Sequence, residues 1–188
     1  MRHAFLTDAQ IDARALAHRR EFGFRDDEAV EVGALLARLA ARYPEFSCRR
    51  VADGSLGEAE AQWDGQGKRL LIRDSVLRAA ERGEGRALMT VAHEVGHALL
   101  GHDGTLSRAP AGGRAERVSA KLRSMEYQAR RYAAALLIPD TPATRALDAA
   151  ALSERYRVSM SAAIVRHSEL RSGESARALP LRQAALDL

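Results

Sequence analysis

The chain has 188 residues, of which 46% are hydrophobic, with a formal net charge of +4 and a single cysteine, Cys48. This length and apolar content suffice for one folded core, so intrinsic disorder is not expected. One cysteine excludes an intramolecular disulfide and a multi-thiolate zinc site, and no stretch approaches the roughly 18 uncharged apolar residues of a membrane span. Because residues 1–10 also lack an apolar signal core, the sequence predicts a cytoplasmic protein. Arginines alternate with acidic residues, which is typical of solvated helix faces and does not favour nucleic-acid binding.

The N-terminal part of the chain predicts two helices followed by a small sheet. A capping-box pattern at Thr7 opens a helix that runs to about Phe22, and a second helix runs from Asp26 or Asp27 to just before Pro44. Short apolar segments separated by glycine-containing turns then predict three antiparallel strands, over residues 47–52, 58–63 and 68–73. We expect segment 68–73 to form the open edge of this sheet, where a peptide could pair as an additional strand.

The remainder of the chain is expected to be helical. A helix from about Arg86 ends at Gly101, because glycine is favoured directly after a helix. Residues 102–117 are rich in Gly, Ala and Arg, and form either a plain linker or a lid over a site. Other helices are expected over 74–81, 118–138, 144–156 and 159–170. The predicted fold class is therefore α+β, with residues 1–140 as the main domain and residues 141–188 as a C-terminal helical subdomain packed on it.

The most informative segment is His93-Glu94-Val95-Gly96-His97, which apolar residues flank on both sides. Residues i and i+4 of a helix share one face, so His93 and His97 can bind one metal ion. Glu94 lies beside them, where it can accept a proton from a metal-activated water. An exposed polar stripe is the less favoured interpretation, because the flanks indicate a mostly buried helix in which unpartnered polar groups would be costly.

A hydrolytic zinc site usually needs a third protein ligand, and two residues compete for this role. Asp103 follows His97 at the metzincin-like spacing, but that pattern requires a glycine three residues after the second histidine, and the sequence has Leu100 there. Glu126 is favoured because it shares a predicted helix face with apolar and small residues, which would let that helix pack closely: Leu122, Ala129, Ala133 and Leu136.

Two less favoured assignments remain for the third ligand. Glu126 can instead be an ordinary glutamate near a helix start, where the helix dipole favours negative charge. Glu116 is a weaker candidate ligand, since it lies at the end of the predicted loop.

Two blocks of the sequence resemble the ImmA/IrrE metallopeptidases. They are HEVGHALLGH at residues 93–102 and EYQARRYAAALLIP at residues 126–139, which occur in the family's order and approximate spacing. The segment LSERYRVS at residues 152–159 resembles a third, weaker block of the family, so the likeness covers roughly residues 30–170. Tyr132 and Ile138 replace the family's commoner phenylalanine and methionine, and both replacements change the side-chain volume only slightly.

The resemblance implies a zincin-like minimal metallopeptidase of the gluzincin type. Zinc would be bound by His93, His97 and Glu126, with Glu94 as the general base, although the same donors also accept manganese or another divalent ion. The resemblance further implies a cytoplasmic endopeptidase whose protein substrate is a helix-turn-helix (XRE-type) transcriptional repressor, cleaved or otherwise inactivated in a stress or mobile-element response. His102 fits the family pattern, but neither the residues nor the resemblance assigns it a role.

Two other functions stay open at this point. Residues 152–170 resemble a helix-turn-helix, which would suit a regulatory or DNA-binding module, but the second helix offers few base-reading side chains beyond Arg166 and His167. Alternatively, the metal site is structural or belongs to an inactive relative that senses rather than cleaves. A closed structural site normally has four protein ligands and only three are supported here, so the catalytic interpretation is favoured. The sequence predicts neither substrate-binding residues nor the oligomeric state.

Overall fold

A computed structural model describes residues 6–102 and 113–184, with side-chain surroundings for residues 6–102 and 123–172. Most of the predicted loop at 102–117 lies outside the described residues, so its role as linker or lid stays a prediction. Asp103 also lies outside them, as does the side chain of Glu116.

The chain begins with helices α1 (Asp8–Glu21) and α2 (Val32–Arg42). Thr7 caps α1 through the predicted capping box with Gln10. The second helix starts later than predicted, because the side chain of buried Arg19 donates a hydrogen bond to the carbonyl oxygen of Arg25 and holds residues 25–28 as a turn. Asp26 and Asp27, the expected helix start, instead form ion pairs with Arg20 of α1 and with Arg25, respectively.

The sheet corrects two expectations about its strands. Strands β1 (Ser47–Val51), β2 (Ala61–Asp64) and β3 (Arg69–Arg73) lie in the order β1-β3-β2, with β3 antiparallel to β2 but parallel to β1. The sheet is therefore mixed rather than antiparallel, and segment 68–73 forms its centre rather than an edge. The physical reason is burial: Leu70 and Ile72 of β3 are fully buried, and a central strand protects both of its backbone edges.

Six helices follow the sheet in the described part of the chain. They are α3 (Asp74–Glu81), α4 (Gly85–Leu99), α5 (Gly113–Leu137), α6 (Pro142–Arg145), α7 (Ala149–Tyr156) and α8 (Met160–Ala184). The single helix expected over 144–156 is two, because the side chains of Thr141 and Asp148 each cap a new helix start. None of the helices in the described ranges combines the length and apolar character needed to cross a bilayer.

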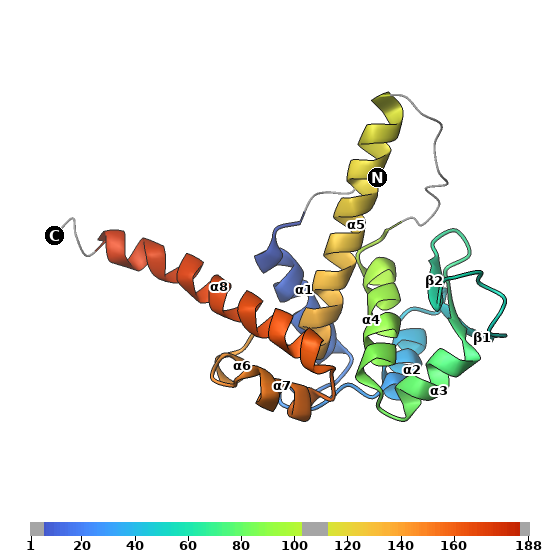
Figure 1. Ribbon diagram of the computed structural model, residues 1–188, viewed down its shortest axis with the longest axis horizontal. Coiled ribbons are helices and arrows are strands. Elements are labelled where there is room, and N and C mark those ends of the chain that lie inside the picture. The colour runs from blue at the N-terminus through green and yellow to red at the C-terminus, as the bar shows by residue number, and fades with distance from the viewer. Residues whose placement is uncertain (1–5, 103–112, 185–188) are drawn as a thin grey trace.

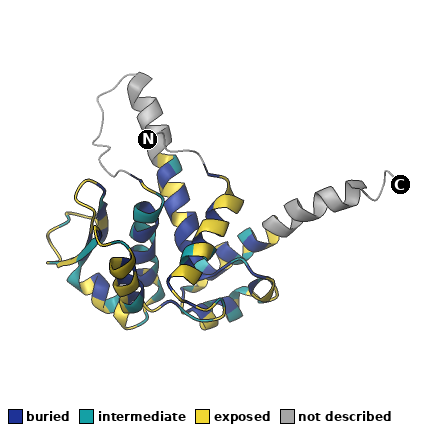
Figure 2. Ribbon diagram, turned by 180° about the vertical axis from the view of Figure 1, so that it is seen from behind, coloured by how far each residue is buried: buried dark blue, intermediate teal, exposed yellow. Residues whose placement is uncertain are grey.

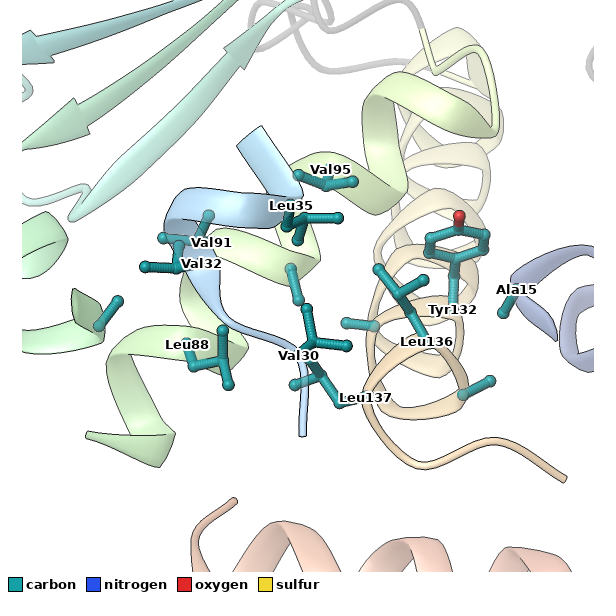
Figure 3. Packing of buried hydrophobic residues seen from close by; sticks show 14 of the residues in the cluster. Ala15, Val30, Val32, Leu35, Leu88, Val91, Val95, Tyr132, Leu136 and Leu137 are labelled. Carbon is teal, nitrogen blue, oxygen red and sulfur yellow. The ribbon is translucent and has the colours of Figure 1, made fainter. Parts of the chain in front are cut away.

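Helix α5 lies between α1 and α4, while the sheet, α2 and α3 lie on the other side of α4 (Figure 1). Where α4 and α5 pack together, most of their described residues are buried or partly buried (Figure 2). The core at this junction includes Val91 and Val95 of α4, Leu35 of α2 and Leu136 of α5 (Figure 3). Leu152 and Tyr156 of α7 belong to the same cluster of buried residues. The two helices that carry the predicted metal ligands are therefore fixed against each other by the main core.

Candidate metal centre

Both histidines of the motif project from one side of helix α4. Val91 and Val95 anchor the opposite side of this helix in the core, where both are completely buried. The rings of His93 and His97 lie edge to face, and their Nε2 atoms are 3.1 Å apart. The i,i+4 spacing thus brings two imidazole nitrogens to one point, as the sequence predicted.

Glu126 of α5 meets these two nitrogens from the facing helix. Its Oε2 lies 3.1 Å from His93 Nε2 and its Oε1 lies 3.2 Å from His97 Nε2. These hydrogen bonds with His93 and His97 hold the pKa of the Glu126 carboxyl well below its ordinary value. The Glu126 side chain is 57% exposed, so the point where the three side chains meet opens to solvent.

A glycine lets α4 and α5 approach closely enough for this meeting. A Cβ atom at Gly96 would lie 2.9 Å from the Ala129 carbonyl oxygen and 3.2 Å from the Tyr132 ring. Ala129 and Ala133 on α5 are completely buried, so both helices present small surfaces at the contact. The close packing expected from the small residues of α5 is present, and Gly96 supplies its counterpart on α4.

The three side chains fit a divalent metal ion. In a tetrahedral zinc site with bonds of about 2.0–2.2 Å, neighbouring donor atoms are about 3.3–3.6 Å apart. The donor atoms here are separated by 3.1–3.2 Å, slightly less than that. Two imidazoles and a carboxylate are also the donor set of many catalytic zinc sites. A small adjustment of the side chains would therefore accommodate the ion.

Glu94 lies next to this cluster but faces a different partner. Its Oε2 accepts a hydrogen bond of 2.7 Å from the backbone N–H of Trp63 in β2. A carboxylate oxygen of Glu94 also lies within 4.8 Å of ring nitrogens of His93 and His97. Burial raises the pKa of the Glu94 carboxyl above its ordinary value, which brings it closer to the range suited to a general base.

His102, whose role the sequence left open, contacts the Nδ1 atom of His97. Gly101 adopts a left-handed conformation with φ of +68°, and the turn lets the His102 N–H donate to the His97 carbonyl oxygen at 2.9 Å. The same turn places His102 Nδ1 3.0 Å from His97 Nδ1, and His102 is only 2% exposed. Contacts of this kind fix the orientation of a metal-binding imidazole, so that its other nitrogen faces the metal.

Comparison with known proteins gives a family match across this region. The model of the IrrE N-terminal-like domain, which defines a peptidase family, matches residues 60–168. The chain belongs to the ImmA/IrrE family. The match confirms the resemblance seen in the sequence and supports a metallopeptidase, since the family is typically metal-dependent.

A solved structure shares the fold of this ImmA/IrrE family member. It is a transcriptional regulator from Mycobacterium tuberculosis, with a TM-score of 0.53 and 19% sequence identity. The alignment covers 86% of this chain but 56% of the regulator, so the chain spans little more than half the length of that protein. A comparison with curated protein sequences gives no match.

The family member also has a cavity beside the cluster of His93, His97 and Glu126, which the sequence did not predict. The cavity has a volume of about 770 Å³, and His93 and Glu94 form part of its wall. Its other lining residues come from α4, α5, the first turns of α8 and Ser159, which directly precedes α8. Because these helices are far apart in the sequence, only their packing reveals that they share a cavity.

The helix-turn-helix-like segment is packed differently from a free DNA-reading element. Arg166, one of the two residues considered for base contacts, is completely buried. Its guanidinium group donates to the Ile138 carbonyl oxygen at 3.0 Å and to Asp12 of α1 at 3.1 Å. Arg166 therefore joins α8 to the rest of the molecule and does not face solvent, where DNA would bind.

Proposed function

We propose that this protein is a zinc-dependent endopeptidase in which His93, His97 and Glu126 bind the metal and Glu94 is the general base. The observation that carries the proposal is the meeting of three donor atoms at separations of 3.1–3.2 Å, with a buried carboxylate beside them. Membership of a peptidase family supports hydrolysis of peptide bonds rather than another metal-dependent reaction.

The chemistry divides between the metal and the protein side chains. When bound, zinc acts as a Lewis acid that polarises a peptide carbonyl and makes a water molecule acidic enough to lose its proton near neutral pH. Glu94 accepts that proton on its carboxylate and then donates it to the leaving amine. The raised pKa of Glu94 suits the first of these steps, because a stronger base accepts the proton more readily than an ordinary surface glutamate. His102 holds the His97 ring in place during these steps.

The edge of the sheet next to Glu94 offers a place for the substrate backbone. Strand β2 lies at an edge of the sheet, since it pairs only with β3 among the described strands. Its Trp63 N–H points to Glu94. We propose that an extended peptide pairs with this edge, in place of the β3 segment favoured by the sequence.

We further propose that the protein acts in the cytoplasm on a helix-turn-helix (XRE-type) transcriptional repressor. Membership of the ImmA/IrrE family supports this substrate class. The solved protein of similar fold is itself a transcriptional regulator, which is consistent with a role in gene regulation.

The general-base role is tested by changing Glu94 to Gln in the full chain. Glu94→Gln should bind zinc as the wild type does, but should hydrolyse an unstructured reporter polypeptide at least about 100-fold more slowly. His97→Ala should lose both zinc and hydrolysis. Glu154→Gln, at an exposed glutamate of α7, serves as the matched control and should change neither. A fully active Glu94→Gln protein would contradict the mechanism.

A further inference from the structure

The cavity beside the cluster has the dimensions of a short peptide segment. Along α4 its wall runs from His93 back to Arg86, which is about 10 Å at the helical rise of 1.5 Å per residue. An extended chain advances about 3.3 Å per residue, so this length corresponds to about three residues. The end at His93 and Glu94 is the candidate metal centre, and the rest extends away from it between α4, α5 and α8.

The middle of the cavity is lined by apolar side chains from all three helices. They are Met89 of α4, Ala134 of α5, and Ala162 and Val165 of α8. Val165 is 56% exposed. When an apolar group of a ligand covers exposed apolar surface in a concave site, the free energy of the complex falls. The small side chains of Ala134 and Ala162 leave room for that group.

The charged groups at the cavity differ in whether they already have partners. Arg86 pairs with Glu60 at 2.8 Å, Arg131 pairs with Asp12 at 2.8 Å, and Glu169 pairs with Arg166 at 3.1 Å. Arg130 also lines the cavity and is exposed, but no residue among those described forms an ion pair with it. Away from Glu94 and the candidate metal centre, the uncompensated charge of the described cavity lining is therefore positive.

We propose that this cavity selects the substrate: an apolar side chain close to the scissile bond binds against Met89, Ala134, Ala162 and Val165, and a neighbouring acidic residue pairs with Arg130. The occupant is thus a polypeptide segment with a large aliphatic or aromatic residue next to Asp or Glu. The proposal rests on the proposed function, because His93 of the candidate metal centre and the adjacent Glu94 form part of the cavity wall. It also gives α8 a specific task, since Ala162 and Val165 belong to that helix.

The test measures peptide binding separately from hydrolysis. Zinc-loaded Glu94→Gln protein is exposed to a library of short random-sequence peptides, and the retained peptides are sequenced. We expect enrichment of an aliphatic or aromatic residue with Asp or Glu within the next two positions. Val165→Trp should weaken binding of the enriched peptides at least about tenfold, because it blocks burial of an apolar side chain. Ile164→Trp is the matched control, since Ile164 is 54% exposed on the same helix but does not line the cavity, and should leave binding unchanged.

The acidic preference is tested with a second pair of variants. Arg130→Glu should weaken binding of the enriched peptides roughly two- to fivefold, as expected for an exposed ion pair, and should shift the preference toward Lys or Arg. Arg171→Glu makes the same charge change at an exposed position of α8 outside the cavity, and should do neither. No enrichment, or equal effects of the cavity variants and their controls, would overturn the proposal. Selective binding without cleavage of the same peptides by the wild type would support the cavity assignment and overturn the proposed function.

Discussion

At the scale of single residues, the candidate centre depends on neighbouring groups that hold His97 and Glu94 in position. His97 can present Nε2 to His93 and Glu126 because its Nδ1 is held by His102, and Glu94 is held by the backbone of Trp63. The sequence predicted His93, Glu94 and His97 from their spacing, since helix geometry alone brings such residues together. It gave His102 no role, because the left-handed turn at Gly101 that returns His102 to His97 depends on how the chain leaves the helix.

Replacement of His102 should therefore weaken metal binding without removing a ligand. We expect His102→Ala to lower the zinc affinity about 10- to 100-fold, because His97 loses the group that orients its ring. His102→Asn should restore part of the affinity, since its amide oxygen can accept a hydrogen bond from His97. The measurement is competition with a zinc chelator, with His167→Ala at a half-buried histidine of α8 as the control. Equal affinities for His102→Ala and the wild type would show that the contact has no orienting role.

At the scale of elements, the close packing of α4 on α5 decides whether Glu126 reaches the histidines. The sequence predicted this packing from the alanines of α5 and the position of Glu126 among them. It did not predict the order of the strands, because local apolar patterns do not specify which neighbour each strand takes. Segment 69–73 occupies the centre of the sheet because its residues Leu70 and Ile72 are the most deeply buried of the strand side chains.

A methyl group at Gly96 should disturb this contact. Gly96→Ala is expected to destabilise the fold by about 1–3 kcal/mol, because its Cβ would meet the Ala129 backbone at 2.9 Å and force the helices apart. The zinc affinity should fall as well, since Glu126 moves with α5. Gly33→Ala in α2 is the matched control: nothing lies within 4 Å of its Cβ, so stability should stay the same or rise by a few tenths of a kcal/mol. Urea unfolding of both variants checks the comparison, and a Gly96→Ala protein as stable as Gly33→Ala would refute the packing argument.

At the scale of the whole molecule, a buried group of charges joins the C-terminal helices to the N-terminal helix. Arg166 of α8 and Arg131 of α5 both bind Asp12 of α1, and all three side chains are at least nine-tenths buried. The sequence indicated Arg166 only as a candidate for base contacts, since a long-range contact with Asp12 leaves no local pattern. The division at residue 140 stays a prediction, but this ion-pair group and the shared core connect the segments on either side of it.

Breaking this group should destabilise the molecule as a whole. Arg166→Ala is expected to lower the free energy of unfolding by about 3–5 kcal/mol, because Asp12 and Glu169 lose a buried partner. Arg171→Ala, at an exposed arginine of the same helix, should change it by less than about 0.5 kcal/mol. Urea unfolding monitored by circular dichroism measures both. An Arg166→Ala protein that keeps wild-type stability would contradict the role of this residue in joining α8 to α1.

The most direct test of the central claim is the zinc affinity of Glu126→Ala, measured by chelator competition beside the wild type and Glu94→Gln. If Glu126 of α5 completes the centre begun by His93 and His97, its removal should weaken zinc binding by more than about 100-fold, because losing a direct ligand costs more than losing an outer partner. Glu94→Gln should bind zinc with wild-type affinity. Wild-type zinc affinity in Glu126→Ala, together with loss of zinc in Glu94→Gln, would contradict the assignment and make Glu94 the third ligand.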